Sequence, residues 1–156
     1  YEIPFEAWYA KGYRGVIFDI DNTLVPHGAP ADARSIALMK RLSAIGYQVM
    51  MLSNNKEPRV KSFCDAVRTD YIYKANKPFV GSYQKAMQKM GTTSKTTLFV
   101  GDQLFTDVWG AKKAGMKTIL VKPIHPKEEI QIVIKRFFEK IVLYFYEKER
   151  GKNEAG

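Results

Sequence analysis

The sequence predicts an α/β protein built on a doubly wound parallel sheet of five strands, with helices on both faces. Two observations support this fold class. Short apolar segments alternate with helix-like segments along most of the chain, which is the pattern of consecutive βαβ units. In addition, the chain has 156 residues, the size of one domain, and 46% of them are hydrophobic, which is enough to bury a core. We therefore expect residues 1–156 to form a single domain.

Five short runs of β-branched, aromatic and other apolar residues predict the strands. In chain order they are Val16–Ile20, Gln48–Leu52, Tyr71–Tyr73, Thr97–Val100 and Lys117–Val121. Apolar residues three or four positions apart predict the helices Asp32–Ile45, Glu57–Val67, Phe79–Met90, Phe105–Ala114 and, last, about 127–150. Asp32 is a suitable N-cap, Gly46 a suitable stop, and Pro58 fits a first helical turn. Pro123 and Pro126 break the chain before the last helix.

Polar residues lie where the predicted strands end, and a doubly wound sheet binds its ligands at that edge. Asp19 and Asp21 come at the end of the first strand, where alternation would place them on one face. They could simply form a turn, but Asp19 lies within an apolar run, where an unpaired carboxylate is costly. We therefore expect these two aspartates to carry chemistry.

Other polar residues follow the next three strands. They are Ser53, Asn54 and Asn55 after the second, Lys77 after the third, and Asp102 and Asp107 after the fourth. Each alone has a simpler explanation as a loop, cap or solvated residue. Strand ends converge in such a fold, so we expect these residues to share one pocket with Asp19 and Asp21. The carboxylates in that pocket would repel each other and need a cation, and oxygen ligands without His or Cys favour Mg²⁺. A lysine and Ser or Asn donors beside Mg²⁺ suit a phosphoryl group.

The ordered motifs Asp-x-Asp-x-Thr, a strand-end Ser, a Lys and Gly-Asp-x-x-x-Thr-Asp resemble those of the haloacid dehalogenase (HAD) superfamily, over about residues 15–121. The resemblance implies that Asp19 is the nucleophile and forms an aspartyl-phosphate. Asp21 would protonate the leaving oxygen and then activate water. Lys77 would offset the charge of Asp19 and the phosphate. The implied phosphate-binding residues are Ser53, Asn54 and Lys77, and the implied Mg²⁺ ligands are Asp19, Asp21 through its carbonyl, Asp102 and, directly or indirectly, Asp107.

The resemblance also narrows the reaction and the architecture. The acid at Asp21 is typical of phosphatases and phosphotransferases, whereas dehalogenases lack it. Only about 30 residues separate Asp21 from Ser53, and about 20 separate Asn55 from Lys77, so neither gap has room for a cap domain. We therefore expect an open site, which suits a large or surface-presented substrate, or an oligomer whose neighbour covers it.

The last expected helix is both apolar and basic. Apolar residues at helical spacing include the unbroken run from Ile141 to Tyr146, and Lys and Arg are interleaved with them or follow. One interpretation is a terminal helix packed on the sheet with a solvated basic edge. The other is a segment that rests on an anionic membrane surface. No uncharged run reaches the ~18 residues of a membrane-spanning helix.

Taken together, the capless layout, the Asp-Ile-Asp-Asn-Thr-Leu start and the basic last helix resemble the YqeG-type, phosphatidylglycerophosphate phosphatase-like branch of capless (subclass III) HAD phosphatases. This implies an Mg²⁺-dependent phosphomonoesterase of phospholipid biosynthesis, cytoplasmic or peripheral on the inner face of a membrane. One alternative is a capless phosphatase acting on a soluble sugar phosphate, nucleotide or phosphoprotein, and another is a catalytically silent membrane adaptor. The net charge of +9 also suggests a nucleic-acid-binding module, but the basic residues are dispersed, so we expect no nucleic-acid partner.

Overall fold

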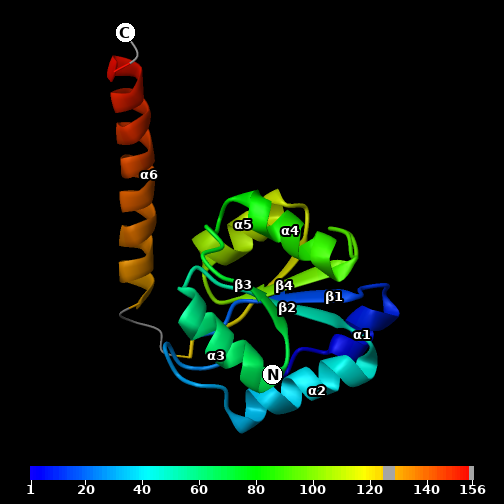
Figure 1. The fold of residues 1–156 in the computed structure, drawn as a ribbon. Coiled ribbons are helices and arrows are strands. Elements are labelled where there is room, and N and C mark those ends of the chain that lie inside the picture. The colour runs from blue at the N-terminus through cyan, green and yellow to red at the C-terminus, as the bar shows by residue number, and fades with distance from the viewer. Residues whose placement is uncertain (125–128, 155–156) are drawn as a thin grey trace. The chain divides into compact units, whose positions relative to one another are not determined.

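Five parallel strands form one sheet in the order β3-β2-β1-β4-β5 (Figure 1). The strands are β1 (Gly15–Phe18), β2 (Gln48–Leu52), β3 (Asp70–Ile72), β4 (Thr97–Gly101) and β5 (Lys117–Leu120). The chain winds outward from β1 to β3 and then returns to β4 on the other side of β1, so the strand order reverses between β1 and β4. The computed structural model therefore confirms the predicted doubly wound sheet.

Helices cover both faces of this sheet, as the sequence predicts (Figure 1). On one face lie α1 (Phe5–Ala10), α2 (Ala33–Ile45) and α3 (Glu57–Val67), and on the other lie α4 (Val80–Met90) and α5 (Trp109–Lys113). A π-helical turn, η1 (Leu104–Val108), runs directly into α5, so the predicted helix at Phe105–Ala114 has two parts. The sequence analysis did not predict α1, a six-residue helix whose Phe5 is fully buried.

Two apolar clusters hold the helices to the sheet. All four residues of β1 are buried, because side chains leave the strand on both faces in alternation. Val16 and Phe18 belong to the cluster that includes Phe5, while Ile17 belongs to the cluster of Tyr83 and Phe99. A central strand covered on both sides is typical of a parallel sheet, and it fixes the position of the loop that follows β1.

Each of the two parts of the chain is described by itself. The structure describes residues 1–124 and 129–154, and the chain divides into the units Tyr1–Ile124 and His125–Gly156. The second unit contains α6 (Glu129–Glu154). Residues 127 and 128 of the expected last helix lie outside the described residues, and the single-domain description stays a prediction. Among the residues described, no helix is both long and apolar enough to cross a bilayer.

The contact between α4 and α5 yields a test of the packing. A Cβ atom added to Gly110 would lie 2.5 Å from the hydroxyl oxygen of Tyr83, whose buried hydroxyl donates to the carbonyl of Thr106 at 2.6 Å. We expect Gly110→Ala to lower the free energy of unfolding by about 1–3 kcal/mol, measured by urea denaturation. Gly81→Ala is the matched control in α4, because nothing lies within 4 Å of its added Cβ. Equal stability of the Gly110→Ala variant and the parent would contradict this account.

Candidate active site

Four charged side chains meet at the carboxyl edge of the sheet, where the strand order reverses. Asp19 directly follows β1, Lys77 lies between β3 and α4, Asp102 follows β4, and Asp107 lies in η1. All four are buried. Because β1 ends at Phe18, Asp19 and Asp21 both belong to the loop, and strand alternation is not what orients them. Both aspartates lie just after the first strand, as the sequence predicts. The expectation that strand alternation would place them on one face does not apply, because they lie outside the strand.

The ammonium group of Lys77 joins two of the carboxylates. Its Nζ donates to Asp19 Oδ1 at 2.7 Å and to Asp107 Oδ1 at 2.6 Å. Burial disfavours the charged form of Lys77, but the Asp107 and Asp19 carboxylates outweigh burial and raise its pKa above the usual value. Lys77 is therefore a fixed positive charge at the bottom of the site.

Three carboxylates gather around this lysine in an arrangement that suits a hard cation. Oxygens of Asp19, Asp102 and Asp107 lie within 4.8 Å of one another. Burial, and then the charge of Asp107, raise the pKa of Asp102 to about 6, although a hydrogen bond from Thr23 opposes the shift. Burial also raises the pKa of Asp19 despite Lys77. One lysine does not compensate the repulsion among three carboxylates, and all the available donor atoms are oxygens. Both features fit the binding of a divalent cation such as Mg²⁺.

The carboxylate of Asp21 has a separate set of partners. Its Oδ1 accepts from Arg59 Nη2 at 2.8 Å and from the backbone N–H of Gly28 at 2.8 Å, while its Oδ2 accepts from Asn55 Nδ2 at 2.7 Å. Burial alone would raise the pKa of Asp21, but these donors and the charge of Arg59 together hold it below its usual value. The two aspartates of the first loop are thus in different electrostatic environments.

The loop after β2 contributes to the site through its backbone and its amides. Asn54 Oδ1 accepts from the backbone N–H of Lys77 at 2.8 Å, and its Nδ2 donates to the Lys77 carbonyl at 3.3 Å. Ser53 is buried, and its Oγ accepts from the backbone N–H of Asn55 at 3.1 Å. Asn54 therefore ties the loop that carries Lys77 to the end of β2. The phosphate-binding roles of Ser53 and Asn54 stay predictions.

Sequence reasoning did not assign roles to three residues whose side chains donate hydrogen bonds to Asp21 or Asp102. They are Thr23, Asn55 and Arg59. Thr23 and Asn55 lie inside the sequence motifs that predict the site. Arg59 had only a weak signal, a basic residue in the first turn of the helix after the second motif.

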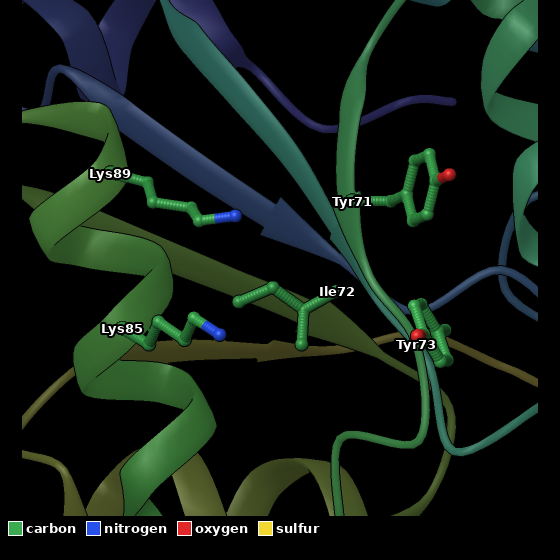
Figure 2. Close-up of a pocket in the computed structure, with 5 residues that line it drawn as sticks. All are labelled: Tyr71, Ile72, Tyr73, Lys85 and Lys89. Carbon is green, nitrogen blue, oxygen red and sulfur yellow. The ribbon is translucent and has the colours of Figure 1, made fainter. Parts of the chain in front are cut away.

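A surface pocket of about 480 Å³ lies away from these residues, on edge strand β3 and helix α4. Figure 2 shows its five lining residues, Tyr71, Ile72, Tyr73, Lys85 and Lys89. They provide two phenols and two amino groups but no carboxylate, nucleophile or set of metal ligands. The chemistry therefore belongs to the strand ends and not to this pocket.

Comparisons with known proteins agree with this site. A family model described as HAD-hydrolase-like matches residues 74–130. The probable phosphatase YqeG of Bacillus subtilis is 37% identical over 125 residues, which cover 80% of this chain and 73% of that protein. The chloroplastic/mitochondrial phosphatidylglycerophosphate phosphatase 1 of Arabidopsis thaliana is 27% identical over 141 residues, 84% of this chain and only 40% of that protein.

A solved structure gives the same result for the fold. The cobalt-bound deoxy-D-mannose-octulosonate 8-phosphate phosphatase of Haemophilus influenzae superimposes with a TM-score of 0.58 at 18% identity, over 69% of this chain and 68% of that one. Fold, site and relatives together define a phosphatase of the HAD superfamily. Within it, the chain belongs to the family of YqeG, the probable phosphatase of Bacillus subtilis.

The proximity of the buried carboxylates predicts that the stabilising effect of a bound metal ion depends on pH. Since the pKa values of Asp19 and Asp102 are raised in the folded state, their contribution to stability is present at low pH and is lost as the pH rises, for Asp102 through about 6. A bound cation offsets this loss. We expect saturating Mg²⁺ to raise Tm clearly at about pH 7.5, by the equivalent of about 2–3 kcal/mol at 100-fold excess over Kd, and little at about pH 5.

Differential scanning fluorimetry measures this shift. Asp102→Asn should abolish it, whereas Asp65→Asn, in an exposed pair with Lys61, should retain it. An Mg²⁺-induced shift of the same size at both pH values would contradict the role of the carboxylate group.

Proposed function

We propose that this phosphatase is an Mg²⁺-dependent phosphomonoester hydrolase that works through an aspartyl-phosphate on Asp19. The observation that carries the proposal is the buried Lys77 ammonium between Asp19 and Asp107, in a group of three carboxylates at the reversal of strand order. Bound Mg²⁺, held by Asp19, Asp102 and the Asp21 carbonyl with support from Asp107, supplies charge neutralisation at the phosphoryl oxygens.

In the first half-reaction, a carboxylate oxygen of Asp19 attacks phosphorus. The bond from phosphorus to the leaving oxygen breaks, and protonated Asp21 gives its proton to that oxygen, which leaves as an alcohol. Lys77 holds one oxygen of Asp19 at 2.7 Å, so it orients the nucleophile and offsets the negative charge that gathers during attack. Ser53 and Asn54 provide further donors for the phosphoryl oxygens.

In the second half-reaction, the carboxylate of Asp21 removes a proton from water. The water oxygen attacks phosphorus, the bond to Asp19 breaks, and inorganic phosphate is released. Asp21 regains its proton in this step and is ready for the next substrate. Its hydrogen bonds to Arg59, Asn55 and Gly28 favour the ionised form that this step requires and oppose the protonated form that the first half-reaction requires.

Removal of the nucleophile tests this mechanism. We expect Asp19→Asn to lower kcat by at least about 10³-fold, because no covalent intermediate can form. The measurement is phosphate release from p-nitrophenyl phosphate with Mg²⁺, together with acid-quench trapping of a phosphorylated chain, which the parent should give and the variant should not. Circular dichroism should confirm that the variant is folded. Substantial residual activity would contradict the role of Asp19.

For the substrate, we propose phosphatidylglycerophosphate, a lipid with a terminal phosphomonoester. Support comes from the similarity to the plant phosphatidylglycerophosphate phosphatase. The short connections after β1 and β2 leave the site open, which suits a headgroup presented at a surface. A panel with Mg²⁺ should compare this lipid in mixed micelles with soluble sugar phosphates, nucleotides and phosphopeptides. A clear preference for a soluble ester would contradict the proposal.

Exposed apolar side chains beside the catalytic loops support a lipid substrate. We call this set the apolar rim, and it comprises Phe79, Leu104, Phe105 and Trp109, which are 59%, 56%, 49% and 46% exposed. Phe79 comes two residues after Lys77, and Leu104 comes two residues after Asp102. Lys113 Nζ lies 4.7 Å from the centre of the Trp109 ring and adds positive charge. Aromatic residues beside basic ones are typical of surfaces that contact lipid headgroups.

Helix α6 supports peripheral membrane contact independently. Apolar residues follow each other at spacings of three and four, so they lie on one side of the helix: Ile134, Phe137, Phe138, Ile141, Val142 and Phe145. The opposite side carries the charged residues Lys135, Arg136, Glu139 and Lys140, together with the exposed apolar residues Leu143 and Tyr146. A helix that combines exposed apolar residues with several basic ones is suited to the interface of an anionic membrane. We propose that α6 contacts an anionic bilayer.

Liposome co-sedimentation tests the role of α6. We expect the full chain to bind vesicles of anionic lipid and to release them as salt rises. Changing Phe138, Val142 and Phe145 together to Ser should weaken binding at least about tenfold, because apolar area is lost from one side of the helix. The matched control changes the same residues to Leu, Ile and Leu and should bind like the parent. Equal binding of the Ser variant would contradict membrane contact through α6.

A further inference from the structure

Arg59 is a second cation at the site, partly buried, and the proposed reaction gives it no contact with the substrate. It lies in the first turn of α3, and its Nη2 donates to Asp21 Oδ1 at 2.8 Å. The side chain is only 19% exposed. Its guanidinium carbon lies 5.8 Å from the centre of the Phe63 ring, so the group has an aromatic neighbour as well as an ionic one.

Most of the hydrogen-bonding capacity of Arg59 is unused. A guanidinium carries five N–H donors. Among the described residues it gives one hydrogen bond, to Asp21, and its buried Nε has no partner. A donor without an acceptor is unfavourable, so the guanidinium would gain from an additional acceptor at its unused N–H groups. Asp21, by contrast, is also held by Asn55 and Gly28 and does not depend on Arg59 alone.

The position of Arg59 follows from the role of Asp21. A general acid must lie beside the leaving oxygen that it protonates. Since Arg59 contacts the Asp21 carboxylate, it lies on the side of the site where the leaving alcohol sits. Lys77 contacts Asp19 and Asp107 and therefore serves the transferred phosphoryl group. The two cations are assigned to opposite ends of the bond that breaks.

We propose that Arg59 binds an anionic group carried by the leaving alcohol, so that the site selects phosphomonoesters whose alcohol bears a second phosphate. The inference rests on the proposed function, because it takes Asp21 as the proton donor. A phosphate diester presents two oxygens that match the planar guanidinium fork. The second phosphate can belong to a lipid headgroup or to a soluble bisphosphate, and the chemistry of recognition is the same.

The experiment compares three substrates in steady-state kinetics with Mg²⁺. One is p-nitrophenyl phosphate, which has no second anion. The others are the soluble glycerophosphoglycerol phosphate and phosphatidylglycerophosphate in mixed micelles. For Arg59→Gln, we expect kcat/KM for both two-phosphate substrates to fall at least about 30-fold further than kcat/KM for p-nitrophenyl phosphate, mainly through KM. Arg59→Lys should recover part of this difference, because a positive charge remains.

Arg68→Gln is the matched control, because it removes the same charge at the other end of α3. It should leave the ratio between substrates unchanged. An equal fall on all three substrates in Arg59→Gln would overturn the inference and make Arg59 a positioning residue for Asp21. A fall in kcat/KM that is confined to the micellar lipid would also overturn the inference, because Arg59 would then interact with the charged surface of the micelle and not with the second phosphate.

The failure of this inference can be told apart from failure of the proposed function. A parent enzyme that hydrolyses p-nitrophenyl phosphate but neither two-phosphate substrate would overturn the lipid proposal together with the inference. A parent enzyme that hydrolyses all three, with unchanged ratios in Arg59→Gln, would overturn the role of Arg59 alone.

Discussion

The ion pairs of Lys77 with Asp19 and Asp107 are the interaction on which the site depends. A buried charge without a partner costs several kcal/mol, so the carboxylates and the lysine are stable there only together. These pairs connect the loop after β1, the loop before α4 and the turn η1. Asn54 then fixes the backbone of Lys77 from the end of β2. The side chain of Lys77 thus connects three segments of the chain, and its backbone connects them to a fourth.

Most of the fold could be predicted because each regular element has a strong local signal. The buried strands are apolar runs, and the N-cap predicted at Asp32 is confirmed by its hydrogen bond from the Ser35 backbone at 2.8 Å. Helix α1 escaped prediction because six residues are too few to display helical periodicity. The turn η1 escaped because a π-helical turn depends on how Asp107 and its neighbours pack, which local sequence does not record.

The site was predictable to the extent that topology determines it. Carboxyl ends of parallel strands converge, so Asp19, Lys77, Asp102 and Asp107 could be grouped before any coordinates were known. Arg59 could not be included, since the direction of a helical side chain depends on how α3 packs against the sheet. The same limit applies to Asn54, whose amide contacts the Lys77 backbone and which sequence alone could assign only to the phosphate.

The placement of β1 in the middle of the sheet has a consequence for how the chain folds. β1 pairs with β4, and Gly15 lies opposite Thr97, so the partner is synthesised much later. Until β4 arrives, one side of the apolar central strand is an open edge with unpaired backbone groups. Contacts of such long sequence separation form slowly, because a large loop must close first. The incomplete chain on the ribosome is therefore the form most exposed to aggregation, and early chaperone contact would protect this edge.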